Sequence, residues 1–140
     1  MLINQLAVFL ENKEGQVHEI ARIMGENNVN MLTVSIADTE NYGILRCITS
    51  DNAMAESILK TYGFNVVSVD LIGFRVDNEP GKLDKVLDVL DKNKINIGYM
   101  YSFSNGGDKK ALILIKVDDN DKTLNILNNA GINLADDNII

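Results

Sequence analysis

The sequence has 140 residues, enough for one ordinary domain or for two small ones that share a core surface. Hydrophobic residues make up 46% of it and charged residues 24%, which are globular proportions and exclude a disordered or fibrous protein. The formal net charge of −7 repels nucleic-acid phosphates and acidic lipid surfaces, so we expect neither nucleic acid nor a membrane as a partner.

The first half of the chain alternates strand and helix patterns. Four segments have strand character: residues 3–10, 29–37, 42–49 and 64–69. Apolar residues at helical spacing predict helices over residues 16–27 and between the N-cap residues 50–52 and Gly63. The predicted order is β-α-β-β-α-β.

The second half repeats this order without a linker. Its strand-like segments are residues 71–76, 95–103, 111–117 and 132–135. Helical spacing recurs over residues 82–93 and 121–130, and the Gly-rich residues 104–108 are expected to form a flexible hairpin loop. The start of the chain lacks a secretory signal and no run approaches the ~20 apolar residues of a membrane span, so we expect a cytoplasmic protein.

The two halves are copies of each other by residue arithmetic. Gly15 and Gly81 are 66 residues apart, and after the hairpin Gly63 and Gly131 are 68 apart, so the second hairpin loop is longer by about two residues. We therefore expect an α+β protein with two ferredoxin-like βαββαβ units in tandem, residues 1–69 and 70–140, each an antiparallel sheet with helices on one face. Sheet edges and faces need covering, which predicts a homodimer.

Catalytic and metal-binding groups are scarce. His18 is the only histidine and Cys47 the only cysteine, so neither a histidine-based metal site nor a Cys-His pair is expected. His18 is interpreted as an exposed helix residue and Cys47 as a small core residue. Without a phosphate loop, a CxxC pair or a dinucleotide fingerprint, we expect no cofactor and no enzyme.

Polar residues recur at the turn that precedes each first helix. Asn12 and Asn78 each lie three residues before the turn glycine, and Asn30 and Asn96 each lie fifteen after it. We expect the two Asn residues of a unit to come close in space beside the helix N-terminus, where free N–H groups attract a carboxylate while an Asn carbonyl accepts from an ammonium. That is the chemistry of a free amino acid, although Asn is also common in plain turns.

The chain resembles a free-standing tandem pair of ACT domains. The resemblance rests on the repeated element order, on residues 78–81 and 95–97, and on their counterparts 12–15 and 29–31. It implies a regulatory module that binds amino acids or similar small molecules at interfaces between units. The residues that it implies for the site are Asn12, Gly15, Asn30, Asn78, Gly81 and Asn96.

The second turn differs from the first. Pro80 pre-sets its backbone, where the first turn has Glu14 instead of the usual proline. Tyr99 and Tyr101 alternate along the strand that follows and so share one face of it. Their rings are interpreted either as a platform for a ligand or as plain sheet packing. If only one site is occupied, we expect it to use the second turn. Leu10 and Val76 stand where some serine-binding members carry a histidine, which counts against serine.

Three functions are compatible with the sequence. The leading hypothesis is an allosteric regulator that binds a free amino acid and acts on a separate enzyme of amino-acid metabolism. The second is a ligand-free association module for such an enzyme, in which the Asn residues only shape turns. The third is an acylphosphatase-like hydrolase, which would need an Arg in the anion-binding turn, whereas Arg75 lies before its turn.

Overall fold

A computed structural model describes residues 2–11, 13–38, 41–104 and 109–138. The chain divides into two compact units: the N-terminal unit, Asn4–Val69, and the C-terminal unit, which joins Met1–Ile3 to Asp70–Ile140. Among the described residues, no helix combines the length and apolarity needed to cross a bilayer.

The N-terminal unit has the predicted element order. Its elements are β1 (Leu2–Glu11), α1 (Gln16–Glu26), β2 (Met31–Asp38), β3 (Tyr42–Thr49), α2 (Asn52–Thr61) and the first part of β4 (Asn65–Asp77). The strands lie in the order β2-β3-β1-β4, and β3 pairs antiparallel with both β1 and β2. Strands consecutive in the chain are thus not all neighbours, which is the ferredoxin-like arrangement.

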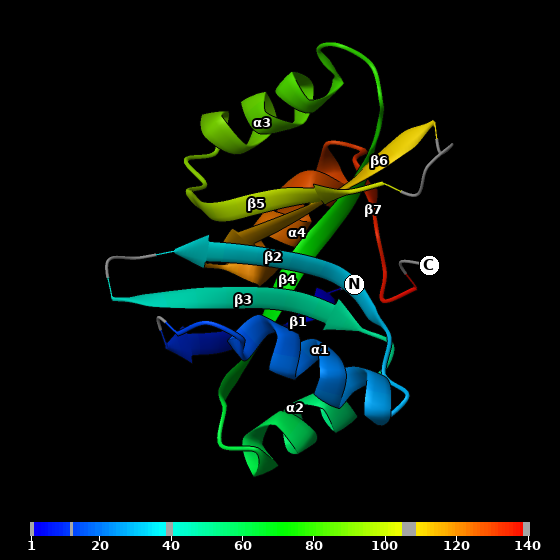
Figure 1. Ribbon diagram of the computed structural model, residues 1–140. Coiled ribbons are helices and arrows are strands. Elements are labelled where there is room, and N and C mark those ends of the chain that lie inside the picture. Colours follow the sequence, from blue (N-terminus) through cyan, green and yellow to red (C-terminus); the bar gives the residue numbers. More distant parts are fainter. Residues whose placement is uncertain (1, 12, 39–40, 105–108, 139–140) are drawn as a thin grey trace. The chain divides into compact units, whose positions relative to one another are not determined.

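The C-terminal unit repeats this topology. It continues from β4 with α3 (Lys82–Lys92), β5 (Ile97–Phe103), β6 (Lys110–Val117), α4 (Asn120–Asn129) and the short β7 (Asn133–Leu134). Its strands lie in the order β5-β6-β4-β7, with antiparallel pairing throughout (Figure 1). The predicted fold class, with two tandem ferredoxin-like units, is confirmed.

The junction of the two units is one strand. The sequence predicts separate strands over residues 64–69 and 71–76, but the structure shows β4 as a single strand of 13 residues. No Pro or Gly interrupts residues 65–72, so nothing there ends the extended backbone. The separation into two strands is therefore wrong, and the last strand of one unit continues directly as the first strand of the next.

The helix termini reproduce the repeat in backbone geometry. Gly15 and Gly81 are the N-caps of α1 and α3, with left-handed φ values of 85° and 83°. Asp51 and Asp119 are the N-caps of α2 and α4, and each accepts a hydrogen bond from the backbone N–H three residues later. The same position thus uses the same cap chemistry in both units.

These caps predict opposite effects for two glycine-to-alanine changes. Gly81→Ala should lower the free energy of unfolding by about 1–2 kcal/mol, because an L side chain is strained at its φ of 83°. Gly25→Ala should raise it by about 0.5 kcal/mol, because an added Cβ meets nothing within 4 Å and Gly is a poor helix former. Urea denaturation measures both, and equal effects of the two changes would contradict the cap argument.

Each unit has its own apolar core between sheet and helices. The N-terminal core includes Leu6, Val8 and Leu45 with Ile20 and Leu59 from the helices. The C-terminal core has its own set, which comprises Ile72, Phe74, Val86, Leu90, Ile113, Ile115, Val117 and Leu127. Every second residue of a core strand points toward the helices and joins the core. The residues between them therefore face the helix-free side of the sheet.

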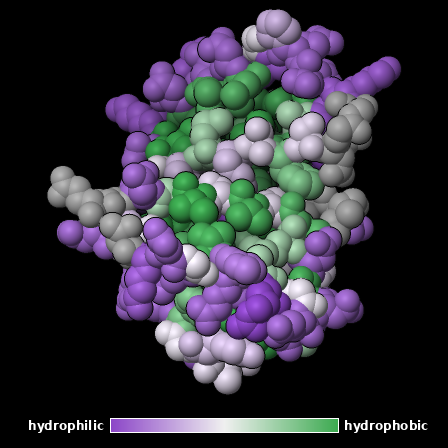
Figure 2. All heavy atoms as spheres, viewed as in Figure 1, coloured by the Kyte–Doolittle hydropathy of each residue, from purple (hydrophilic) through white to green (hydrophobic). Residues whose placement is uncertain are grey.

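The outer strand of the N-terminal unit carries exposed apolar residues. Val34 and Ile36 on β2 are 52% and 51% exposed, although their register partners Cys47 and Leu45 are buried in the core. Figure 2 shows apolar surface over this strand. An outer strand with apolar side chains is a surface on which a protein partner can pair or pack.

Candidate ligand-binding site

The N-terminal unit has a cavity of about 340 Å³ where β1 ends and α1 begins. The segments that line it come from four places: the end of β1, the first residue of α1, the start of β3 and the loop between α2 and β4. Its lining residues are Phe9, Leu10, Glu11, Gln16, Asn41, Tyr42, Gly63, Phe64 and Asn65. Aromatic rings, amides and one carboxylate therefore meet at a single hollow.

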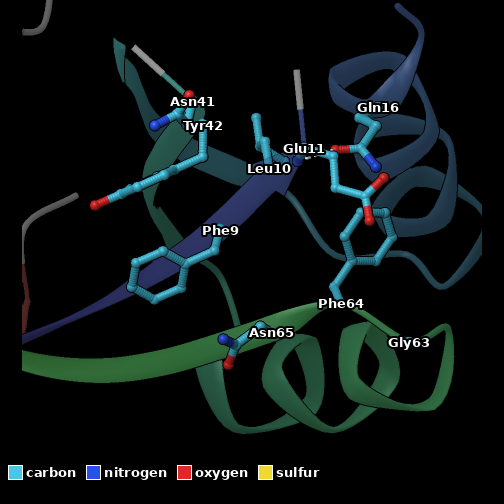
Figure 3. A pocket seen from close by; sticks show the side chains of 9 residues that line it. All are labelled: Phe9, Leu10, Glu11, Gln16, Asn41, Tyr42, Gly63, Phe64 and Asn65. Carbon is cyan, nitrogen blue, oxygen red and sulfur yellow. Dashed lines mark hydrogen bonds between the residues drawn. The ribbon is translucent and has the colours of Figure 1, made fainter. Parts of the chain in front are cut away.

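The lining groups divide into two sides (Figure 3). The rings of Phe9 and Tyr42 lie on one side, with their centroids 6.3 Å apart, and Phe64 lies with Glu11 and Gln16 on the other. The Glu11 N–H donates to Oε1 of Gln16 at 2.8 Å, which ties the end of β1 to the first turn of α1. Since its Oε1 is used in this way, the Gln16 amide has its Nε2 donor available for a ligand.

Charge at this cavity is set by Glu11. Nζ of Lys13 lies 2.8 Å from its carboxylate, and this hydrogen bond and charge together lower the pKa of Glu11. The carboxylate therefore stays ionised at neutral pH. Cys47 behaves oppositely, because burial in the core raises the pKa of its thiol to about 11, so it is not a nucleophile at neutral pH.

The C-terminal unit has a cavity of about 250 Å³ at the equivalent place. It is lined by Arg75, Val76, Asp77, Lys82, Lys85, Val86, Lys110, Gly131, Ile132 and Asn133. Glu11 pairs with Tyr42 across β1 and β3, and Asp77 pairs with Lys110 across β4 and β6 in the same register. The two cavities are thus built from the same positions of the duplicated fold.

Several predicted site residues lie at the turns that border these cavities. Gly15 and Gly81 cap the helices that line them, and Asn78 and Pro80 are exposed in the second turn. The backbone N–H of Asn78 donates to the Lys109 carbonyl at 2.9 Å. Asn12 lies outside the described residues.

The expected closeness of the two Asn residues is wrong for the C-terminal unit, where the structure describes both of them. Asn78 precedes the 11-residue helix α3 and Asn96 follows it, so the helix separates them. Asn96 lines a different cavity, of about 190 Å³, with Asp118, Asp119 and Lys122 among its neighbours. In the N-terminal unit, Asn30 likewise follows α1, and its N–H donates to Ser50 Oγ at 2.9 Å.

Tyr99 and Tyr101 are half-buried on β5 and line neither equivalent cavity. A register shift between Ile97 and Tyr99 places Tyr99 opposite Lys116 and Tyr101 opposite Leu114, whose neighbours Ile113 and Ile115 supply the core. Both rings therefore face the helix-free side of the sheet. Their role in ligand binding stays a prediction.

None of the described residues predicted for the site lines either of the two equivalent cavities. Phe9, Glu11, Gln16 and Tyr42 carry no motif, and their common location follows only from strand order and register. The repeat offset contained a usable signal, because Asn65 matches Asn133 at 68 residues and both line a cavity. Among the described residues, no three His, Cys, Asp or Glu side chains gather as a metal site would need.

Comparison with known proteins gives one family and a set of similar structures. The model of the ACT domain pair matches residues 1–140. A protein from Bacteroides thetaiotaomicron is similar in structure, with 36% identity, a TM-score of 0.91, and coverage of 98% of this chain and 94% of that one. The sequence matches no curated protein.

More distant structures share the fold alone. The regulatory subunit of aspartate kinase from Thermus thermophilus, in a ligand-free form, has 10% identity and a TM-score of 0.62 over 92% of this chain and 93% of that one. The corresponding subunit from Thermus flavus has 11% identity and a TM-score of 0.61 over 94% of each chain.

Proposed function

Because this chain belongs to the ACT domain family, we propose that it is a regulatory protein that binds a free amino acid or a similar small molecule at the turns preceding its first helices. The N-terminal cavity is the site that we assign to this ligand, in place of the second turn that the sequence favours for a single site. The observation that carries the proposal is the cavity of about 340 Å³ beside the Gly15 turn, where a carboxylate, amides and aromatic rings converge.

The lining suits a zwitterion with a side chain. The Glu11 carboxylate accepts from an ammonium, while the amides of Gln16 and Asn65 donate to a carboxylate. The rings of Phe9 and Phe64 supply apolar surface for the rest of the molecule (Figure 3). A zwitterion would thus be bound at both of its charged groups. A purely apolar or purely anionic molecule could not make both of these contacts.

Regulation would be exerted on a separate enzyme of amino-acid metabolism. The fold shared with regulatory subunits of aspartate kinase supports a role of this kind. Val34 and Ile36 on the outer strand β2 offer an apolar surface for a second copy, and we propose a cytoplasmic homodimer that catalyses no reaction itself. The predicted residues Asn78, Pro80 and Gly81 stand at the second turn, beside the cavity of the C-terminal unit, and are not assigned to this site.

A thermal-shift screen of the twenty amino acids tests the proposal. The cognate amino acid at a hundred times its dissociation constant should stabilise the chain by about 2.7 kcal/mol, because it binds the folded state only. Stabilisation by none of them at millimolar concentration would contradict the proposal.

Matched variants then locate the site. Asn65→Ala should weaken binding of that amino acid roughly fivefold in isothermal titration calorimetry, since it removes one amide hydrogen bond. Asn133→Ala makes the same change at the equivalent exposed position of the C-terminal unit and should leave this affinity unchanged. A loss with Asn133→Ala alone would move the site to the other cavity.

A further inference from the structure

The two equivalent cavities differ in charge. Among the described residues, Glu11 is the only charged one that lines the N-terminal cavity, whereas four cations and one carboxylate line the C-terminal one. At three matched positions the cation replaces an uncharged residue: Arg75 stands for Phe9, Lys82 for Gln16 and Lys110 for Tyr42. Lys85 is the fourth cation of this basic cavity.

These cations are not neutralised by the described protein. The side chains of Arg75, Lys82, Lys85 and Lys110 have no ion pair or hydrogen bond with another described residue. Asp77 is the one carboxylate among the described residues of the lining, and it lies opposite Lys110 in the register without forming an ion pair. Some lysines elsewhere do find partners: Lys92, at the other end of α3, lies 2.6 Å from Asp88.

The concentration of unpaired cations runs against the charge of the whole chain. With 20 acidic and 13 basic residues, the protein repels anions at long range, so four cations at one cavity with no partner among the described residues need an explanation. α3 begins at this cavity, and its N-cap Gly81 offers no side chain to the first-turn N–H groups. The positive end of the helix therefore adds to the lysines and the arginine.

We propose that the basic cavity is a second ligand site, distinct from the amino-acid site, and that it binds a small dianion. A phosphate group and a dicarboxylate share the required chemistry, since each presents two negative charges to several N–H donors. A volume of about 250 Å³ suits a small metabolite of this kind. The duplication has thus produced one cavity for a zwitterion and another for a dianion.

Isothermal titration calorimetry at low ionic strength tests this with inorganic phosphate and with succinate. The wild-type chain should bind at least one of them. The probe that binds more tightly shows whether the site prefers a phosphate group or a dicarboxylate. The variant Lys82→Gln with Lys110→Tyr gives two positions of the basic cavity the residues of the N-terminal unit. It should weaken that binding about tenfold.

The control variant is Lys60→Gln with Lys92→Gln, which changes the net charge equally at helical ion pairs whose lysines do not line the cavity. It should bind the dianion as the wild type does. Failure of both dianions to bind at up to about 10 mM, or equal weakening in the two variants, would overturn the proposal. The amino-acid screen stays independent of this result, because the N-terminal cavity contains none of these four cations.

Discussion

Replacing Phe74 with alanine is expected to lower the free energy of unfolding by about 3–5 kcal/mol. Phe74 is 0% exposed and is the largest fully buried side chain of the chain's described part. It lies on β4 between β6 and β7, where Ile113 and Leu134 are its register partners. Removal of the ring loses the free energy gained by burying it and leaves a cavity. This cavity cannot close easily, because paired strands hold the backbone on both sides of Phe74.

Val67→Ala on the same strand is the matched control. Val67 is 44% exposed, so its truncation removes little buried surface and should cost less than about 1 kcal/mol. Urea denaturation followed by circular dichroism measures both free energies. A cost below about 2 kcal/mol for Phe74→Ala would mean that the core around β4 collapses onto the hollow.

The elements of this fold follow from local patterns. Aliphatic spacing identifies the four helices of the described residues. Residues 50–52 and Gly63 mark the ends of α2, and the structure places its N-cap at Asp51. These signals are local because a cap or an amphipathic face depends on residues within one or two turns. The topology could be predicted from the repeat, because a β-α-β-β-α-β order in each unit is typical of the ferredoxin-like antiparallel sheet.

The missed features depend on contacts that no local pattern encodes. The continuity of β4 reflects the absence of a chain-breaking residue, whereas the repeated element order divided this segment into the last strand of one unit and the first strand of the next. The distance between Asn78 and Asn96 depends on the length of α3, because a helix of 11 residues separates its ends by about 16 Å. In both cases the order of the elements along the chain was predicted correctly, but their lengths in the folded structure were not considered.

The duplicated units conserve geometry and differ in chemistry. Gly15 and Gly81 keep a left-handed backbone, and Asp51 and Asp119 keep the same cap, because the fold requires both. Most cavity positions are under no such requirement, since their side chains reach solvent, whereas Leu10 and Val86 also belong to the two cores. Comparison of equivalent positions therefore separates residues that shape the scaffold from residues, such as Lys82, that are free to select a ligand.

Gly73→Ala is expected to cost up to about 3 kcal/mol by overpacking the C-terminal unit. A Cβ added at Gly73 would overlap Cδ1 of Ile3, and it would lie 3.2 Å from Cβ of Ala135 and 3.3 Å from Cδ2 of Leu114. Ile3 is 2% exposed and Leu114 is 0% exposed, so neither can turn into solvent. The glycine is thus required by close packing on the helix-free face of β4, not by its φ.

A double-mutant cycle identifies the side chain responsible. Ile3→Val removes Cδ1 and alone should cost about 0.5–1.5 kcal/mol. Combined with Gly73→Ala, it should cost less than the sum of the single changes by at least about 0.5 kcal/mol, because the valine vacates the space that the new methyl group needs. Additive costs in urea denaturation would mean that Ala135 and Leu114 set the limit instead. Because Ile3 belongs to the C-terminal unit, a strong coupling would show that the first strand helps to fold the second copy as well as the first.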